Sequence, residues 1–371
     1  MLTDSERALA RAVLIHGPIA RSALTNRLGL SPASLTRLAK PFLDRGYLVE
    51  LDDLPDGTVG RPVRPLDVAP DLGGFAGVKI TGDAVHAVVT DVRAGLRAQR
   101  TVPLATHLPE EVAAVIARTL GAMADDGLVG VGVALGGAVD DGVVRYAPFL
   151  GWEDVAFASV LEQELGVPVA LENDLIALTE AERWFGLGRG IPGFVVLTIG
   201  VGVGYGLVVG GEVVHSAEAG LGLGGHIPLS DNGPLCQEGH RGCSQAMLTS
   251  GSIAAQVSAA LQRTVTYDEV LALALAGEPA AVAVVDAAAE ALGRFIALAA
   301  NLTFQSAAVL AGDGIGLFPI VEDRVRAAIS AGRDPRAQPV QLFVDDSGFT
   351  AWARGAAAVA IQAAVDRLRL D

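Results

Sequence analysis

Hydrophobic positions in the first 70 residues recur at helical spacing and predict three short helices, which are followed by two short alternating segments. Ser31 and Pro32 begin the third helix, because serine is a favoured N-cap and proline a favoured first helical residue. A tight turn at Gly29 separates this helix from the second one, so the pair forms a helix-turn-helix and the alternating segments form a wing. The helices are expected at residues 5–16, 20–28 and 32–46, and the wing strands at 47–51 and 64–68.

From residue 73 onward the pattern changes to an α/β arrangement of strands and helices. Three hairpin-linked strands open this part, and a similar strand-turn-strand unit returns at an offset of 119 residues, which indicates a degenerate internal duplication. Two similar lobes that face each other leave a cleft, the usual place for a small ligand. We expect a DNA-binding domain at residues 1–70, a first lobe at 71–190 completed by a C-terminal helix at 351–371, and a second lobe at 191–350.

Composition narrows the class of protein. The chain has 371 residues, of which 51% are hydrophobic, and only two are cysteines, so a disordered chain and a disulfide scaffold are excluded. Its apolar stretches are interrupted by glycine before they reach the roughly 20 residues that a membrane span needs. The N-terminus lacks the features of a secretory signal, and we therefore expect a cytoplasmic protein without membrane contact.

Charge is distributed unevenly along the chain. The net charge of −15 argues against a nucleic-acid partner for the whole protein. Residues 1–70, however, carry nine basic and eight acidic side chains, whereas the other 301 residues carry 18 and 34. A small basic module therefore precedes an acidic body, and only the module is attracted to a DNA duplex.

Candidate DNA contacts lie on the third helix and the wing. The N-terminal half of a recognition helix enters the major groove, where arginine bonds guanine and serine or threonine reaches bases or phosphates. An arginine in an extended wing segment suits the minor groove. The alternative is a trihelical module that docks another protein. The predicted contacts to double-stranded operator DNA are Ser34, Thr36, Arg37, Lys40, Arg61 and Arg64.

Several segments together resemble the ROK family of repressors and sugar kinases. They are GRPVRPL at 60–66, ENDLIALTEAERWFG at 172–186, IGVGVGYG at 199–206, GGH at 224–226 and CQEGHRGC at 236–243. The resemblance implies a two-lobed actin-like, or ribonuclease-H-like, fold behind the winged helix-turn-helix. The DNA-binding extension is typical of the repressor branch, so the resemblance implies a transcriptional regulator that is controlled by a sugar or sugar-derived ligand and acts as a homodimer or tetramer.

The kinase motifs of this family are altered. Family kinases carry DxGGT in the first glycine turn, where the acid and the backbone amides handle metal and phosphate. Lys79 occupies the position of that acid here, and the Gly-Gly-Thr is absent. The glycine turn at 200–204 also lacks the usual threonine, so we expect ordinary β-turns, no ATP binding and no enzyme activity. A sugar kinase that retains a DNA-binding arm is the alternative, because Asp174 matches the family's general base.

Polar residues at the predicted cleft favour a ligand site, but with altered specificity. Asn173 and Asp174 stand where a strand ends and a helix begins, so they either contact a ligand or merely cap the helix. His226 is the third expected ligand contact. The resemblance places Phe149 and Leu223 where the family has polar sugar contacts, which changes or abolishes the original sugar specificity. A vestigial cleft, with control by a protein partner on the acidic body, is therefore another possibility.

A metal site is implied by the spacing of four residues. The family's zinc motif corresponds to His226, Cys236, Glu238 and Cys243, with glutamate in place of the middle cysteine. Zn²⁺ accepts nitrogen, sulfur and oxygen ligands, so this set is feasible for a structural site, and His240 is a substitute donor. The alternative is a loop with two reduced thiols, since a disulfide is disfavoured in the cytosol.

Overall fold

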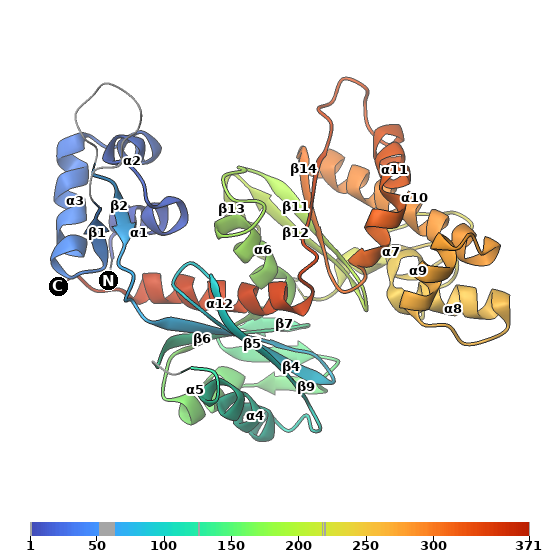
Figure 1. The fold of residues 1–371 in the computed structure, drawn as a ribbon, viewed down its shortest axis with the longest axis horizontal. Helices are drawn as coiled ribbons and strands as arrows, with labels where there is room; N and C mark the ends of the chain where they lie inside the picture. Colours follow the sequence, from blue (N-terminus) through green and yellow to red (C-terminus); the bar gives the residue numbers. More distant parts are fainter. Residues whose placement is uncertain (1, 52–63, 125–126, 217, 219, 371) are drawn as a thin grey trace.

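The structure, a computed structural model, has three parts (Figure 1). It describes residues 2–51, 64–124, 127–216, 218 and 220–370. A small helical module at the N-terminus lies at one end of the molecule, and two α/β lobes, each built on a five-stranded sheet, form the rest. The hydrophobic pattern predicts this architecture of a winged helix-turn-helix followed by two α/β lobes.

The N-terminal module is a winged helix-turn-helix. Its elements are α1 (Asp4–His16), α2 (Arg21–Leu28), α3 (Pro32–Asp44) and the antiparallel strands β1 (Leu48–Glu50) and β2 (Leu66–Val68). Ser31 caps α3, because its Oγ accepts a hydrogen bond of 3.2 Å from the backbone N–H of Ser34. Gly29 ends α2 with a φ of 63°, the left-handed conformation that the tight turn requires. Residues 52–63, which the sequence assigns to the wing, lie outside the described residues.

The first lobe is a mixed sheet with helices on both faces. Its elements are β3 (Gly74–Ile80), β4 (Ala84–Thr90), β5 (Leu96–Pro103), α4 (Pro109–Gly121), β6 (Leu128–Leu135), α5 (Phe157–Leu165), β10 (Val169–Asn173) and the C-terminal helix α12 (Phe349–Arg367). The strand order is β10-β6-β3-β4-β5, with an antiparallel β3-β4-β5 meander and parallel β6 and β10. Apolar side chains of α4 and α5 share a core with one face, and α12 lies on the other.

Two glycines allow α12 to lie directly on this sheet. A Cβ atom at Gly77 would be 1.9 Å from the carbonyl oxygen of Ala353, and one at Gly132 would be 1.7 Å from that of Ala356. Only glycine therefore permits this contact. Because side chains alternate along a strand, Lys79 lies on the same face of β3 as Gly77 and is directed toward α12.

The second lobe surrounds another five-stranded sheet in the order β13-β12-β11-β14-β15. Its elements are β11 (Phe194–Ile199), β12 (Val203–Val209), β13 (Glu212–Val213), α7 (Ser244–Leu248), α8 (Ser250–Leu261), α9 (Tyr267–Leu275), α10 (Pro279–Thr303), β14 (Ala307–Ala311), α11 (Phe318–Ala331) and β15 (Gln341–Val344). Helix α6 (Asp174–Trp184) packs against both α12 and β12 and thus contacts both lobes. Its N-terminus follows β10 directly, as the sequence predicts.

Some elements of the lobes were not predicted from the sequence. They are α5, α7, α8, α9, α11, β15 and a small sheet of β7 (Ala138–Asp140), β8 (Val143–Ala147) and β9 (Trp152–Val155). In α8 and α9, alanine is so frequent that the two faces differ little in polarity. The internal duplication is nevertheless visible, since β3-β4-β5 and β11-β12-β13 are both antiparallel meanders.

The winged helix-turn-helix is packed onto the lobes by a shared apolar core. Buried Leu9 and Val13 of α1 belong to the same cluster as Trp184 of α6 and Ile361 of α12. Arg93 of the first lobe adds polar links, because its guanidinium donates to the carbonyl oxygens at the end of α1. The module is therefore joined to the helices that connect both lobes.

No single helix in the described part of the chain is long and apolar enough to cross a membrane. The pair α9 and α10 meets the length and composition criteria only when taken together, and it is bent by 105°.

Candidate functional site

The first candidate site is the outer face of α3. Thr36, Arg37 and Lys40 are exposed there, and Ser34 is half-buried. Ser34 and Thr36 use their hydroxyls locally, since the Oγ atoms of Ser31 and Ser34 are 3.0 Å apart and Thr36 Oγ1 donates to the carbonyl of Pro32 at 3.0 Å.

The two basic side chains of this face lie one turn apart. Arg37 and Lys40 have no hydrogen-bond or ion-pair partner among the described residues. Of the two wing arginines, Arg64 is exposed just before β2, and Arg61 lies outside the described residues. The structure thus leaves at least two cationic groups on α3 available for an anionic partner.

The second candidate site lies where the two lobes meet, and its centre is an ion pair. Lys79 on β3 bonds through its Nζ to the Oδ2 atom of Asp174, the first residue of α6. Their side chains are only 8% and 18% exposed. The Nζ atom also lies 5.2 Å from the ring centroid of Trp352 on α12. The carboxylate that the resemblance places at the kinase base is therefore bonded to the residue that stands where the resemblance places the kinase acid.

Asn173 acts as the cap of α6. Its Oδ1 atom accepts hydrogen bonds from the backbone N–H groups of Leu175 and Ile176 at 3.0 and 3.2 Å, and its Nδ2 donates to the carbonyl of Gly137 at 2.9 Å. The side chain is 4% exposed. Its capping role is thus observed, whereas ligand contact by Asn173 and Asp174 stays a prediction.

The glycine turns of the cleft are held by hydrogen bonds of their own. Thr81 Oγ1 donates to Asp83 at 2.8 Å, and the Thr81 backbone N–H bonds to the carbonyl of Ala84. The turn of the second lobe is held from another segment, because Asp313 accepts a hydrogen bond from the backbone N–H of Val201 at 3.4 Å. That both turns are ordinary β-turns stays a prediction.

Aromatic side chains lie beside the ion pair, since Trp352 is near Lys79 and Phe149 is near Asp174. Phe149 and Leu223, the two residues that the resemblance places at sugar contacts, are 60% and 62% exposed. A methyl group placed on Gly136 would be 3.5 Å from the Asp174 carboxylate and 3.7 Å from the Phe149 ring, so the ring and the carboxylate flank the same point. A ligand at Asp174 would therefore meet an aromatic face as well as a charge pair.

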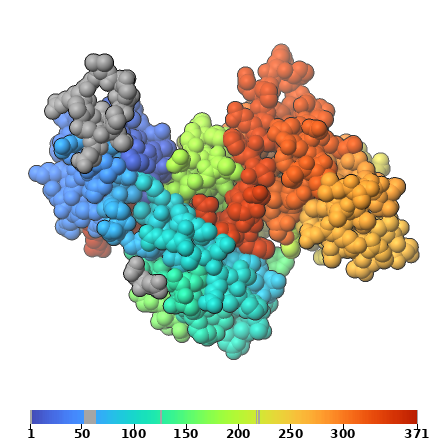
Figure 2. All heavy atoms as spheres, in the orientation of Figure 1, coloured from blue at the N-terminus to red at the C-terminus, as the bar shows by residue number. Residues whose placement is uncertain are grey.

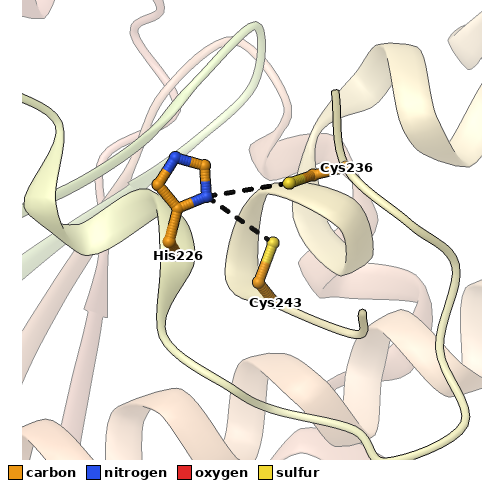
Figure 3. Close-up of side chains that lie close together, drawn as sticks. All are labelled: His226, Cys236 and Cys243. Atoms are coloured by element: carbon orange, nitrogen blue, oxygen red, sulfur yellow. Dashed lines mark hydrogen bonds between the residues drawn. The ribbon is translucent and has the colours of Figure 1, made fainter. Parts of the chain in front are cut away.

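The third candidate site is a cluster of one imidazole and two thiols (Figure 3). The Nδ1 atom of His226 lies 3.8 Å from the Sγ of Cys236 and 3.9 Å from that of Cys243. All three donor atoms lie within 4.8 Å of one another. Zn–S and Zn–N bonds of roughly 2.3 and 2.0 Å span such separations, so the donors suit one metal ion.

Two further residues adjoin this cluster from different sides. His240 Nδ1 is 3.6 Å from the Sγ of Cys236. Glu238 approaches the opposite ring edge of His226, with its Oε2 4.0 Å from Nε2. A hydrogen bond with Cys236 lowers the pKa of Glu238, which keeps this exposed carboxylate charged. The fourth position of a tetrahedral site thus has two candidate donors.

Sequence analysis missed a buried polar network on α6 that is centred on Glu180. This carboxylate accepts hydrogen bonds from Arg183 at 2.9 Å and from Gln362 of α12 at 2.8 Å, and His215 of the second lobe lies 3.6 Å away. Burial alone would raise the pKa of Glu180, but the bond with His215 and the Arg183 charge outweigh it, so the pKa is lowered. The pKa of His215 is raised by the same bond. The sequence shows only that Glu180 and Arg183 are three residues apart on a predicted helix, a spacing at which opposite charges can pair.

The family model that matches this chain covers residues 75–363 and is described as the ROK family. The chain belongs to the ROK family. The match begins beyond the wing, so the winged helix-turn-helix precedes the ROK domain. The resemblance noted in the sequence is thereby confirmed.

Curated ROK relatives of the chain are named as repressors. The DNA-binding transcriptional repressor Mlc of Escherichia coli is 26% identical over 86% of this chain and 84% of its own length. A xylose repressor of Bacillus spizizenii is 21% identical over 99% of this chain and 97% of its own length. Both alignments extend over most of either chain.

Solved ROK structures confirm the actin-like fold. A ROK family transcriptional regulator, described as a homologue of the E. coli MLC protein, superposes with a TM-score of 0.79 at 22% identity and covers 98% of this chain and 97% of its own. A ROK hexokinase from Thermus thermophilus gives a TM-score of 0.66 at 28% identity and covers 79% of this chain and 99% of its own. The hexokinase structure thus matches about four fifths of this chain and leaves about one fifth unmatched.

Proposed function

We propose that this protein is a sugar-responsive transcriptional repressor whose winged helix-turn-helix binds an operator. The observation that carries the proposal is the exposed basic face of α3, with Arg37 and Lys40 unpaired among the described residues, on a module fixed to a ROK body. In this role the α3 face lies in the major groove, with Ser34 and Thr36 beside it and the wing arginines Arg61 and Arg64 on the adjacent backbone or minor groove. Because its partner is chromosomal DNA, its place of action is the cytoplasm.

The effector occupies the cleft between the lobes, near Asp174, Asn173 and His226. A ligand that binds one arrangement of the lobes better than the other shifts the balance between them. Helix α12 carries that change to the DNA-binding module, because it lies on the first sheet, contacts α6 and ends in the core shared with α1. The Glu180–Gln362 bond joins α6 to the same helix.

The cleft does not carry out phosphoryl transfer in this proposal. A kinase base must accept a proton from a sugar hydroxyl, but the Asp174 carboxylate is already bonded to Lys79. The first turn also lacks the glycine pair that brings backbone amides to the phosphate. We therefore propose no ATP binding and no enzyme activity.

The His226, Cys236 and Cys243 cluster holds a structural zinc ion in this proposal, completed by Glu238 or His240. Two thiolates and an imidazole are ligands that zinc prefers. Such an ion would fix the loop that follows the 3₁₀ turn at Leu223–His226 against the cleft. Zinc would supply no catalytic step here.

A homodimer or a tetramer is the proposed DNA-binding form. One winged helix offers few base contacts, so two modules on a two-fold operator are needed for specific binding. We assign residues 1–70 to the DNA-binding domain, 71–190 with 351–371 to the first lobe and 191–350 to the second lobe.

Fluorescence anisotropy with DNA from upstream of the protein's own gene tests the DNA-binding part. Binding that is at least about 1,000-fold tighter than to a scrambled duplex of equal length supports the proposal. Equal affinity for both duplexes would instead make the winged helix a protein-docking module.

A sugar kinase with a DNA-binding arm is the second candidate, because the 28% identical hexokinase covers nearly its full length on this chain. A coupled ATP assay with a panel of hexoses decides between the two. Phosphorylation that Asp174→Asn abolishes would establish the kinase, and no turnover above the blank supports the repressor.

A further inference from the structure

A cavity of about 600 Å³ lies between the winged helix-turn-helix and the lobes, and neither Lys79 nor Asp174 lines it. Its walls come from α1, the end of α2, the end of α6, residues 190–192 and the turn at 210–212. In Figure 2 the blue N-terminal helices meet the lime-green part of the second lobe in this region. Its volume is in the range of small-molecule sites.

The lining of this junction cavity is basic, although the chain as a whole is acidic. Four guanidinium groups and one imidazole face two carboxylates. The basic residues come from both sides of the junction. They are Arg7, Arg11, His16, Arg27 and Arg183, and the acidic ones are Asp4 and Glu212.

One part of the cavity is held by ion pairs. Asp366 at the end of α12 pairs with Arg7 at 2.9 Å and with Arg11 at 3.4 Å. Arg183 pairs with Glu180 at 2.9 Å and with Glu212 at 3.2 Å. These contacts fix the arginines without filling the cavity.

The other part has cations without acceptors. Arg27 lines the cavity, Arg189 lies near it, and neither has an ion-pair or hydrogen-bond partner for its side chain among the described residues. Burial lowers the pKa of His16, and the positive charges of Arg27 and Arg189 lower it further. The three residues therefore share a region of positive potential.

Buried donors next to the cavity are also unsatisfied. Trp184, which lines the cavity and is completely buried, has no acceptor for its Nε1–H among the described residues. The buried Nε of Arg11 has none there either, and the Arg11 guanidinium lies 5.7 Å from the Trp184 ring centroid. Buried donors without a protein partner are rare in folded proteins, and many of them bond to an ion or an ordered water molecule. The wall of the cavity thus contains donors that the described residues leave unsatisfied, as well as cations.

We infer that the junction cavity is a second effector site, which binds the phosphate group of a small metabolite. Arg27 and Arg189 meet the dianion, because guanidinium groups bond phosphate in a bidentate manner. The ligand bridges α1 and α2 to α6 and the 210–212 turn, so it fixes the winged helix relative to the ROK body. The two DNA-binding modules of a dimer are then held at one spacing, independently of the sugar cleft.

Isothermal titration calorimetry on the full-length protein, at constant ionic strength, tests this inference. The probes are inorganic phosphate, glucose 6-phosphate and unphosphorylated glucose. The variant is Arg27→Gln with Arg189→Gln, both on exposed side chains. The matched control is Arg97→Gln with Arg100→Gln, an equal charge change on the exposed strand β5.

We expect one phosphate probe to bind with one site per chain, and the Arg27/Arg189 variant to weaken it at least about tenfold while the control leaves it unchanged. If glucose 6-phosphate binds more tightly than inorganic phosphate, the ligand is a phosphorylated metabolite. If the two bind with equal affinity, the ligand is free phosphate. Glucose binding, if present, should be the same in all three proteins. No phosphate binding, an equal loss in both variants, or displacement of the probe by non-operator DNA would overturn the inference.

Discussion

Lys79 and Asp174 form a buried ion pair at the point where the two lobes meet. The family resemblance places both at positions that serve phosphoryl transfer in kinases, and here the two side chains bond to each other. The pair links β3 of the first lobe to the start of α6, which also contacts the second lobe. The ion pair thus joins elements whose relative movement an effector would change in the proposed function.

Breaking this pair should destabilise the protein. Asp174→Asn leaves the buried Lys79 ammonium uncompensated, so it should lower the free energy of unfolding by about 3 to 5 kcal/mol. Lys79→Met leaves a carboxylate that is 18% exposed, so it should lower the free energy of unfolding by less. The double variant should be clearly more stable than the sum of the single effects predicts, because it leaves no unpaired charge. Urea unfolding of the four proteins measures this. Additive effects would mean that the two side chains do not interact in solution.

Arg37 and Lys40 should differ in how they affect operator binding. Arg37→Ala should weaken operator binding by about 1 to 3 kcal/mol and relax specificity at one base pair, as expected for a base contact. Lys40→Ala should weaken operator and random DNA alike and reduce the salt slope by about one, as expected for a phosphate contact. Anisotropy titrations across salt measure both effects. Arg97→Ala on β5 is the control and should leave both affinities unchanged.

Metal content should depend on the His226 cluster. Cys236→Ser and Cys243→Ser should each remove most of the zinc, measured by mass spectrometry of protein purified without chelator. The spacing of the sequence motif points to Glu238 as the fourth ligand, but His240 approaches the Cys236 sulfur at 3.6 Å. We expect His240→Ala to weaken zinc binding more than Glu238→Ala does. Full zinc occupancy in Cys236→Ser would contradict the site.

Glu182 should make stability depend on pH. Burial raises the pKa of this carboxyl to about 7, and the nearby Asp345 carboxyl adds to the effect, although the Leu187 N–H and the Arg354 charge oppose it. The folded state therefore keeps a proton that the unfolded state releases above its ordinary pKa of 4.5. The contribution of Glu182 to the free energy of unfolding is largest below pH 4.5 and decreases as the pH rises toward 7. Above pH 7 it no longer changes.

Glu182→Gln should remove this decline. The difference in melting temperature between the variant and the wild type should grow in favour of the variant from about pH 5 to about pH 7.5, the range in which only the unfolded state is ionised. Thermal unfolding followed by circular dichroism measures it. A difference that is independent of pH would show that Glu182 is ionised throughout the range.

Local signals in the sequence predicted much of the fold. Ser31 and Pro32 indicated the start of the recognition helix, and the change from helical to alternating spacing near residue 73 separated the module from the lobes. The long core strands, such as β3, β6 and β11, were clear because they are apolar and bounded by turns. Helices α8 and α9 were not, because their alanine-rich faces differ little in polarity.

The sites were only partly predictable for a different reason. The identity of Lys79 showed that the kinase acid was lost, but not that its amine reaches Asp174, since that bond joins residues 95 positions apart. The Glu180 network and the junction cavity depend on the packing of α1, α6 and α12, which no local pattern encodes. The cluster of His226 with two cysteines was predictable, because the chain has these residues at the spacing of the family's zinc motif.

Operator affinity in the presence and absence of sugars tests the central claim most directly. The measurement is a fluorescence anisotropy titration of full-length protein on its own upstream DNA, repeated with a panel of pentoses and hexoses at fixed salt. A ligand-gated repressor predicts that one sugar shifts the dissociation constant at least about fivefold, the lower end of typical allosteric coupling. Specific binding that no sugar alters, although the same sugars bind the protein, would contradict the claim that the cleft controls the DNA-binding module.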